Sequence, residues 1–349
     1  MLINVVNPAA ADPIRVVDQR GKTIELAKPA ERIVTIPMPM ASVVMAIDGS
    51  SRRVVGMHPA ARKSVQDGFL KKVYPDAAAI PADVVRGGMF TPNLEALTAL
   101  RPDVVIQWTE PPDLIRTLEN AGFTTVGLIN SPPNQDVHER NMAIVGAVIG
   151  QTARIDRLLG LHRSTRAKVE AALAGLPPAE RPRVLYLRAT EGTPMAAGRN
   201  TYQDFWIGLC GGRNVAAETI VGTETPIGAE QIVAWDPQVI FIGTFDDATP
   251  KTLYANPAFA AVSAIRDKRV YKLPHGGYRW DPGNQESHLT WMWAAQLLHP
   301  DRVNFDVRAA IAELYPFLYS YSPSQSEIDA VLQLPLNKSM RHYERFAGR

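Results

Sequence analysis

Short apolar runs alternate with helix-like stretches through both halves of the chain. The runs are rich in β-branched residues and end at proline, glycine or charged positions, as buried strands do. They span residues 32–36, 54–56, 103–106, 125–129, 183–187, 239–242 and 269–273. Between them, apolar residues recur at helical spacing in residues 40–47, 94–100, 114–121, 202–209 and 285–298. This alternation predicts an α/β fold built on largely parallel sheets.

The middle of the chain has a different pattern. Residues 151–173 keep apolar positions at helical spacing and contain no proline, with Gly150 before them and Gly175 after them. One helix of that length would span about 35 Å at 1.5 Å per residue, which suits a strut between two lobes. An ordinary surface helix has the same periodicity, so the pattern alone leaves both interpretations open. With a strut, the chain divides into an N-terminal lobe at 14–150, a linking helix at 151–175 and a C-terminal lobe at 181–349.

An internal echo supports two related lobes. The stretches 94–106 and 229–241 each place a glutamate seven residues before a proline, and an apolar strand follows the proline. A short helix that ends before the proline and leads into a buried strand explains this shared spacing. Chance similarity between two helix–strand corners is the alternative, but one copy on each side of the strut favours duplicated lobes.

Length, charge and cysteine content narrow the class of protein. The chain has 349 residues, enough for two lobes, and 46% of them are hydrophobic. Its 37 Lys and Arg nearly balance its 35 Asp and Glu, which argues against a nucleic-acid binder. The one cysteine, Cys210, can form neither an internal disulfide nor a thiolate zinc site by itself. No window of about 20 residues is continuously apolar, as a membrane-spanning helix requires.

Signatures of common enzymes are missing from the sequence. It contains no phosphate-binding Gly-x-x-x-x-Gly-Lys-Ser/Thr loop, no Gly-x-Gly-x-x-Gly after a strand, no His-Glu-x-x-His and no Gly-x-Ser-x-Gly. The seven histidines are scattered, with no two at a metal-ligand spacing on one helix. We therefore expect no catalytic residue, no cofactor and no metal site made by the protein alone. Two alternatives stay open: a metal-dependent enzyme on a similar two-lobed scaffold, and a free-metal receptor that uses His58, Glu110, His275 and Asp281.

The loops after the predicted strands carry the candidate binding residues. Because ligands bind beyond the carboxyl ends of strands in α/β sheets, we expect these loops to meet at one site. Arginines suit anionic groups, aromatic rings stack on flat ligands, and a histidine or tyrosine can bond to a chelate or its metal. For each residue, packing in the core or within a loop is the ordinary alternative. The expected ligand-binding residues are Met38, His58, Phe90, Trp108, Arg199, Tyr202, Phe245, His275, Tyr278, Arg279 and Trp280.

Several motifs follow one another in the order of a known family. Residues 18–34 read Asp-x-x-Gly-Lys-x-Ile followed by Pro-Ala-Glu-Arg-Ile-Val. They resemble its opening β-hairpin, which has the form Asp-x-x-Gly-Arg-x-Val followed by Pro-x-Arg-Ile-Val. Residues 92–105, Pro-Asn-Leu-Glu-Ala-Leu-Thr-Ala-Leu-Arg-Pro-Asp-Val-Val, are the most specific match, and Gly211–Val215 and Leu298-His-Pro300 come later. Over residues 14–333 the chain resembles the helical-backbone (class III) periplasmic substrate-binding proteins of ABC importers for ferric siderophores, haem and cobalamin.

The resemblance implies an architecture and a role. It implies two Rossmann-like α/β lobes joined by a single long helix, with the ligand in the cleft between them. It also implies that Glu95 and Glu230, one on each lobe, dock onto an inner-membrane ABC permease dimer. The ordinary alternative for both is a carboxylate that the helix dipole favours at a helix start. The protein is then expected to be a monomer that captures a metal chelate, by preference a ferric siderophore, and delivers it to the permease.

The resemblance also bears on the choice of ligand and on location. Residues 317–332 resemble a subgroup whose ligands span ferric chelates, nickel chelates and oxyanions. Haem, a corrinoid, or another chelate or oxyanion is therefore the alternative ligand. A periplasmic or lipid-anchored extracytoplasmic location is implied. Residues 1–6 are too short for the apolar part of an export signal, and no basic residue precedes them. We therefore expect a mature form in which a start methionine stands in place of the signal.

Overall fold

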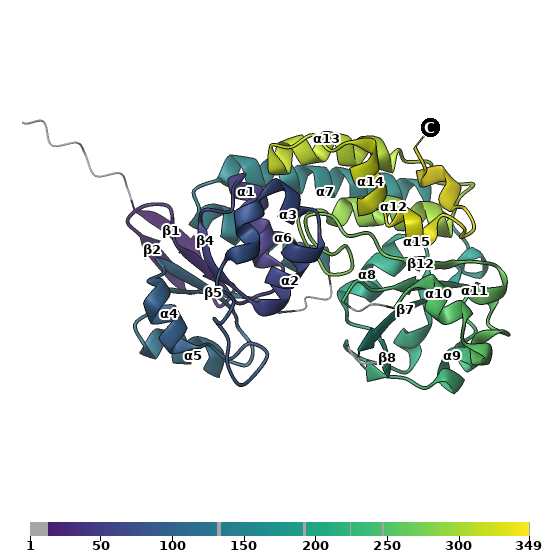
Figure 1. Ribbon diagram of the computed structural model, residues 1–349, viewed down its shortest axis with the longest axis horizontal. Coiled ribbons are helices and arrows are strands. Elements are labelled where there is room, and N and C mark those ends of the chain that lie inside the picture. The colour runs from purple at the N-terminus through teal and green to yellow at the C-terminus, as the bar shows by residue number, and fades with distance from the viewer. Residues whose placement is uncertain (1–12, 131–133, 191–192, 224, 246–247, 349) are drawn as a thin grey trace, which may run out of the picture.

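Two α/β lobes lie side by side in the computed structural model and are spanned by a layer of helices (Figure 1). The structure describes residues 13–130, 134–190, 193–223, 225–245 and 248–348. Every strand and helix predicted from the apolar pattern is present, to within three residues at each end. The predicted strut is α7 (Thr152–Ala172), which begins at the end of one lobe and leads into the other.

The N-terminal lobe is built on a four-stranded parallel sheet with the order β4-β3-β5-β6. Its central strands are buried along their whole length, which explains their continuous apolar runs. The strands are β3 (Ile33–Thr35), β4 (Val54–Met57), β5 (Val104–Trp108) and β6 (Thr125–Leu128). The helices are α1 (Met40–Asp48), α2 (Pro59–Asp67), α3 (Leu70–Val73), α4 (Leu94–Leu100), α5 (Asp113–Asn120) and α6 (Gln135–Val148), with the 3-10 helix η1 (Pro75–Ala79).

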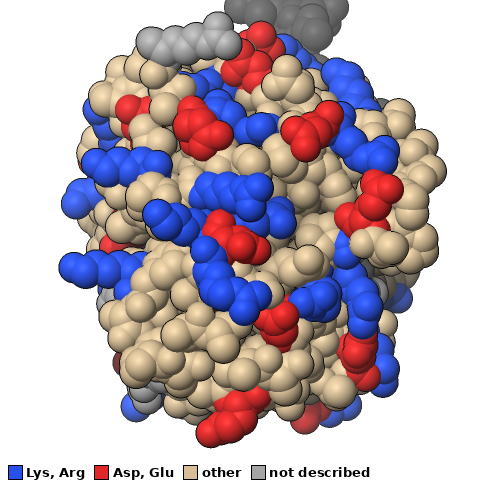
Figure 2. Space-filling view, turned by 90° about the vertical axis from the view of Figure 1, so that its right-hand side faces the viewer, with Lys and Arg blue, Asp and Glu red and all other residues tan. Residues whose placement is uncertain are grey.

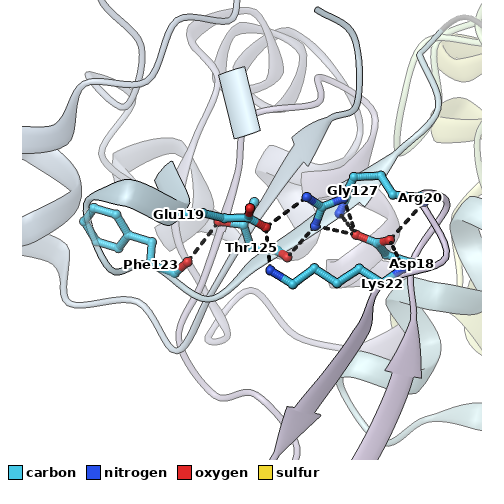
Figure 3. A network of polar contacts seen from close by, with 7 residues as sticks. All are labelled: Asp18, Arg20, Lys22, Glu119, Phe123, Thr125 and Gly127. Carbon is cyan, nitrogen blue, oxygen red and sulfur yellow. Dashed lines mark hydrogen bonds and ion pairs between the residues drawn. The ribbon is translucent and has the colours of Figure 1, made fainter. Parts of the chain in front are cut away.

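A polar network fixes the opening hairpin, β1 (Ile14–Val17) and β2 (Thr23–Leu26), to the edge of this sheet (Figure 3). The buried carboxylate of Asp18 accepts hydrogen bonds from the backbone N–H groups of Arg20 and Gly127, both at 2.9 Å. The Arg20 guanidinium pairs with Asp18 at 2.7 Å and with Glu119 at 2.9 Å. Because Gly127 lies in β6 and Glu119 in α5, the network ties three separate segments together.

The C-terminal lobe has a more elaborate sheet, with the order β10-β8-β7-β11-β12 and with β9 also paired to β7. Strands β7, β9, β11 and β12 run parallel, whereas β8 and β10 add antiparallel pairs at one edge. The strands are β7 (Arg183–Thr190), β8 (Thr193–Ala196), β9 (Arg213–Asn214), β10 (Thr225–Pro226), β11 (Val239–Ile242) and β12 (Val270–Lys272). The helices are α8 (Tyr202–Leu209), α9 (Ala229–Trp235), α10 (Pro250–Tyr254) and α11 (Ser263–Arg266), with η2 (Pro178–Glu180), η3 (Val215–Glu218) and η4 (Pro257–Phe259).

The C-terminal helices return across the molecule and contact the N-terminal lobe. They are α12 (Ser287–Leu298), α13 (Val307–Tyr319), α14 (Gln325–Val331) and α15 (Leu334–Asn337), followed by η5 (Tyr343–Phe346). The ring of Phe69 packs against Tyr315 of α13 at 4.8 Å, and Lys72 of α3 pairs with Glu327 of α14. The strut is therefore not the only link between the lobes: Figure 1 shows α13 lying along α7 above both of them.

The echoed sequences form matching corners. The first runs from α4 into β5 and the second from α9 into β11. The residue before the proline is left-handed in both corners, with φ 44° at Arg101 and φ 40° at Asp236. The shared spacing therefore corresponds to a shared backbone path, as the sequence predicted.

Charged side chains of both signs are mixed on the outer end of the C-terminal lobe (Figure 2). Lys and Arg side chains stand next to Asp and Glu there, and no wide area of one sign is seen on that face. This arrangement agrees with the nearly balanced charge of the chain, +2 at pH 7.

Candidate functional site

A cavity of about 340 Å³ lies between the two lobes. On one side its walls come from the loops after β3 and β4, the end of β5, and α6. On the other side they come from β7, β8, α8 and the loops after β11 and β12. This is where parallel α/β sheets place their ligand sites, and both lobes contribute side chains to it.

The N-terminal wall is mainly apolar. Met38 and Pro39 follow β3, Ala60 lies in the first turn of α2, and Trp108 ends β5. Met89 extends from the loop before α4 and is 59% exposed, which is high for a methionine next to a cavity. This wall offers polarisable thioether and indole surface rather than charge.

His58 is held in one neutral tautomer. The backbone N–H of Ala60 donates to its Nδ1 at 3.1 Å, which caps α2, and its Nε2 lies 2.7 Å from the carbonyl oxygen of Met89. Nδ1 must therefore accept and Nε2 must carry the proton. Burial lowers the pKa of His58, which keeps the ring neutral. Both ring nitrogens are used, so His58 can bind a metal only by giving up one of these bonds.

The C-terminal wall is richer in polar groups. The Tyr186 hydroxyl, from β7, donates to Asp281 at 2.8 Å, and the Tyr202 hydroxyl, from α8, donates to Gln135 at 2.9 Å. Arg188 follows Tyr186 on the same face of β7 and also lines the cavity. Here the backbone of a strand, rather than a loop, positions the charge.

Tyr278 lines the cavity, and its hydroxyl is buried with no hydrogen-bond partner in the described part of the chain. The side chain is only 1% exposed, and burial raises the pKa of its hydroxyl above the ordinary value. The indole Nε1 of Trp108, on the opposite wall, is likewise buried and without a partner there. Buried polar groups are normally satisfied, so two unpaired donors on residues that line the cavity are unusual.

Phe245 is covered by two guanidinium groups. Arg188 lies 4.9 Å and Arg279 lies 4.6 Å from the ring centroid, within cation–π range. Arg279 is 3% exposed, and its Nε donates to the carbonyl oxygen of Thr244 at 2.9 Å. These contacts place positive charge along one side of the cavity.

Comparison with known proteins places the chain in a family. Residues 41–275 match the family model described as "Periplasmic binding protein". The chain belongs to the periplasmic binding protein family. No curated protein matches it in sequence.

Solved structures agree with this membership. A periplasmic solute binding protein from Veillonella parvula DSM 2008 is 30% identical, with a TM-score of 0.84 over 94% of this chain and 99% of that one. Haemophilus influenzae MolA bound to molybdate is 20% identical, with a TM-score of 0.77 over 89% and 99% of the two chains. Helicobacter pylori CeuE in its Ni-His complex is 20% identical, with a TM-score of 0.74 over 92% and 99%. The family and these neighbours are solute-binding proteins.

Membership also carries a general role and location. The periplasmic binding proteins take small ligands, metal chelates among them, work with ABC permeases and act in the periplasm. Among the described residues, none of the helices has the length and apolar composition needed to cross a bilayer.

Six residues singled out from the sequence line the cavity of this periplasmic binding protein: Met38, His58, Trp108, Tyr202, Phe245 and Tyr278. Phe90 lies one layer behind, where its ring contacts His58 at 5.6 Å and Trp108 at 6.4 Å. Arg199 is exposed and forms a β-bridge with Val221, outside the cavity lining.

The other three residues outside the cavity lining belong to the loop after β12, and each has a partner in the protein. His275 is paired with Ser64 at 3.1 Å, and Trp280 donates from its indole to Glu286 at 2.7 Å. Arg279 reaches the cavity only through Phe245. The composition of this loop therefore predicted correctly that it borders the cavity, but of its four predicted binding residues only Tyr278 lines the cavity.

Sequence reasoning missed several residues that line the cavity. Tyr186 lies in the run 183–187, whose apolar pattern predicts only a buried strand, and Arg188 directly follows that run. Met195 lies in β8, which the apolar pattern did not predict. His138 lies inside α6, where nothing in the sequence distinguishes it from a helix-face histidine.

The ligand set considered for a free metal does not assemble. No group of three or more His, Cys, Asp or Glu that could hold a metal ion is found among the described residues. The Asp281 carboxylate accepts hydrogen bonds from the Tyr186 and Thr244 hydroxyls at 2.8 and 2.7 Å, so it serves to fix the C-terminal wall.

Proposed function

We propose that this periplasmic binding protein captures an anionic metal chelate, a ferric siderophore, in the cavity between its lobes and delivers it to the permease of an ABC importer. The observation that carries this proposal is the chemistry of the two walls. Arg188 lines a mainly apolar cavity from one lobe, and Met38 and Trp108 line it from the other. An anionic chelate with an aromatic or alkyl body and outward oxygen atoms would satisfy both walls.

The relatives support a chelate or oxyanion but do not choose among them. MolA binds molybdate and CeuE is seen with Ni-His, although both share about a fifth of their residues with this chain. Ligand choice must therefore follow from this chain's own cavity. Three methionines, Met38, Met89 and Met195, suit a ligand larger and less polar than a bare oxyanion.

Fluorescence of Trp108 gives a direct test. Ferric catecholate and hydroxamate siderophores, haemin, cobalamin and molybdate would be titrated into the protein. We expect a ferric siderophore to quench fluorescence saturably, and Trp108→Phe to remove most of that quenching. Trp235→Phe, in α9 and outside the cavity lining, is the matched control and should keep it. If only haemin or cobalamin binds, that compound replaces the siderophore as the proposed ligand. If no probe changes the fluorescence or the Tm, the proposal that the protein is a chelate receptor is overturned.

For permease docking we propose Glu95 and Glu230. Both are exposed, and each occupies the first turn of its lobe's echoed helix, α4 or α9. In Figure 1 these helices lie on the side of the lobes away from α7 and α13. Charges placed in this way on both lobes would orient the protein over a basic permease surface and speed association.

Charge reversal separates docking from capture. Glu95→Lys with Glu230→Lys should lower chelate uptake in a cell or proteoliposome assay at least tenfold, while affinity for the chelate stays unchanged. Glu313→Lys, at an exposed position of α13, is the control and should leave uptake as it is. Unchanged uptake in the double variant would remove the docking role from these two residues.

We further propose that the protein acts as a monomer, in the periplasm or anchored there by lipid. The large hydrophobic side chains exposed in the described residues, such as Val17, Leu161 and Val233, come from separate elements and form no evident dimer face. Light scattering of the purified protein should give a mass close to 38.3 kDa. A concentration-independent dimer would contradict this state.

A further inference from the structure

Glu286 is a fully buried carboxylate just before α12 that does not line the cavity. Its Oε1 accepts from the backbone N–H of Gly277 at 2.8 Å and from the Tyr319 hydroxyl. Its Oε2 accepts from the Trp280 indole at 2.7 Å and from the Tyr315 hydroxyl at 3.3 Å. Four donors therefore converge on one side chain, two from the loop after β12 and two from α13.

The loop leaves no room for side chains next to this carboxylate. A Cβ at Gly276 would overlap Glu286 Oε2, and a Cβ at Gly277 would overlap the Tyr319 hydroxyl. The two glycines thus let the backbone approach Glu286 closely. Tyr278 comes next in the chain, and its ring is directed to the cavity instead.

The same loop also contacts the N-terminal lobe. The backbone N–H of Phe69 donates to the carbonyl oxygen of Gly276 at 3.1 Å, and Ser64 Oγ lies 3.1 Å from His275 Nε2. Glu286 therefore fixes a segment that touches α13, the cavity and the opposite lobe. Movement of this loop would change the position of Tyr278 and the fit of the two walls together.

A series of buried polar contacts connects Glu286 to Tyr202, another tyrosine that lines the cavity. Tyr319 accepts from the side chain of Gln285 at 3.0 Å, and the Gln285 carbonyl oxygen lies 3.1 Å from His162 Nε2. His162 Nδ1 lies 3.0 Å from the side-chain nitrogen of Gln135, which in turn accepts from Tyr202 through its oxygen. Tyr202 is thus linked by polar contacts to Glu286, which holds the loop that carries Tyr278.

We propose that Glu286 is a positioning residue of the ligand site, which sets the place and orientation of Tyr278 without touching the ligand. This inference rests on the proposed function for the claim that the cavity binds a ligand, but the contacts of Glu286 do not depend on it. Glu286→Gln tests it sharply, because the amide nitrogen that replaces one oxygen cannot accept. Whichever way the amide turns, two of the four donors lose their acceptor.

The first experiment needs no ligand. The protein would be labelled with 3-fluorotyrosine, and the ¹⁹F resonance of Tyr278 assigned from its loss in Tyr278→Phe. We expect that resonance to shift and broaden in Glu286→Gln, and more weakly in Tyr319→Phe, which removes a single donor. Glu313→Gln is the control and should leave it unchanged. An unaltered Tyr278 resonance in folded Glu286→Gln would overturn the proposal, and so would an unaltered one in Tyr319→Phe if Glu286→Gln does not fold.

The second experiment is a double-mutant cycle on affinity for whichever ferric chelate quenches Trp108. If Glu286 acts through Tyr278, Glu286→Gln and Tyr278→Phe should each weaken binding about tenfold, and the double variant should be little worse than either. If the double variant instead loses affinity by the product of the two single losses, Glu286 does not act through Tyr278, and the inference is overturned. Failure of every chelate to bind would instead count against the proposed function, since the ¹⁹F result stands independently of any ligand.

Discussion

The corner from α4 to β5 in the N-terminal lobe and the corner from α9 to β11 in the C-terminal lobe have nearly the same backbone, with φ 44° and φ 40° before the proline. The cavity walls that the two lobes build are not alike. The N-terminal wall has thioethers, an indole and a histidine whose ring nitrogens are both used, whereas the C-terminal wall has three tyrosines and the guanidinium group of Arg188.

The difference follows from what each lobe adds to the shared scaffold. The N-terminal sheet is purely parallel, and side chains reach the cavity from loops, β5 and α6. The C-terminal sheet gains the antiparallel strand β8 and a longer β7, which bring Met195 and Arg188 to the cavity from strands. A duplicated backbone can therefore carry two surfaces of different chemistry, and under the proposed function one would accommodate the body of a ligand and the other its charge.

The largest difference between the lobes should be in how far acid lowers their stability. Burial lowers the pKa of His162 and of His275 to about 4, and it lowers that of His288 well below the usual range. The unfolded chain, with histidines near 6.5, binds protons first as pH falls, so the free energy of unfolding decreases from about pH 6.5 down to about pH 4. Each shift of this size is worth about 3 kcal/mol at the acid end.

These three histidines lie in the strut and the C-terminal segment, whereas the buried histidines of the N-terminal lobe are His58 and His138. Hydrogen exchange at pH 7, 6 and 5 should show amides of α12 and the loop after β12 losing protection before those of β3 and β5. In urea unfolding, His275→Gln should flatten the dependence of stability on pH. Equal loss of protection in both lobes would break the comparison.

Arg188 should control affinity more than any residue of the apolar wall. Arg188→Met removes the charge and keeps a long apolar side chain, and we expect affinity for a ferric siderophore to fall about ten- to a hundredfold. Met38→Leu, on the other wall, conserves volume and should change affinity less than about threefold. Both values come from titration of Trp108 fluorescence. Equal losses in the two variants would mean that the walls do not divide the work.

The same features show what the sequence could and could not predict. Buried strands and the strut were predictable because apolar periodicity reports burial directly, and the echo predicted the paired corners. Strand β8 was not, because Thr193-Pro-Met-Ala196 has neither alternation nor β-branched density, and its pairing with β7 decides its conformation. Arg279 and Trp280 have the right chemistry for a ligand loop, yet Thr244 and Glu286 accept their hydrogens, and no local pattern reveals which side of a turn faces a cavity.

The matched corners invite one substitution with opposite outcomes. Arg101 and Asp236 are both left-handed, a conformation that glycine adopts more readily. Arg101→Gly should therefore raise stability slightly, by up to about 1 kcal/mol. Asp236 also accepts from the backbone and hydroxyl of Ser263 at 2.7 and 2.9 Å and pairs with Arg183 at 2.9 Å. Asp236→Gly should thus lower stability by about 1–2 kcal/mol, measured by urea unfolding. The same sign in both lobes would show that the side-chain contacts of Asp236 do not set its corner apart from the one at Arg101.

A substitution in the strut should have the smallest effect on stability, and it tests whether the two lobes unfold together. Gly160 lies inside α7 with open space where a Cβ would be, so Gly160→Ala should stabilise by about 0.5–1 kcal/mol. Gly146→Ala, in α6, is the matched control and should destabilise, because its Cβ would press against Ile155 at 2.6 Å. Since α7 and α13 link both lobes, Gly160→Ala should move one calorimetric transition upward by about 1–2 °C. Two transitions, of which only one moves, would mean that the lobes unfold independently and that their shared helices do not bind them into one cooperative unit.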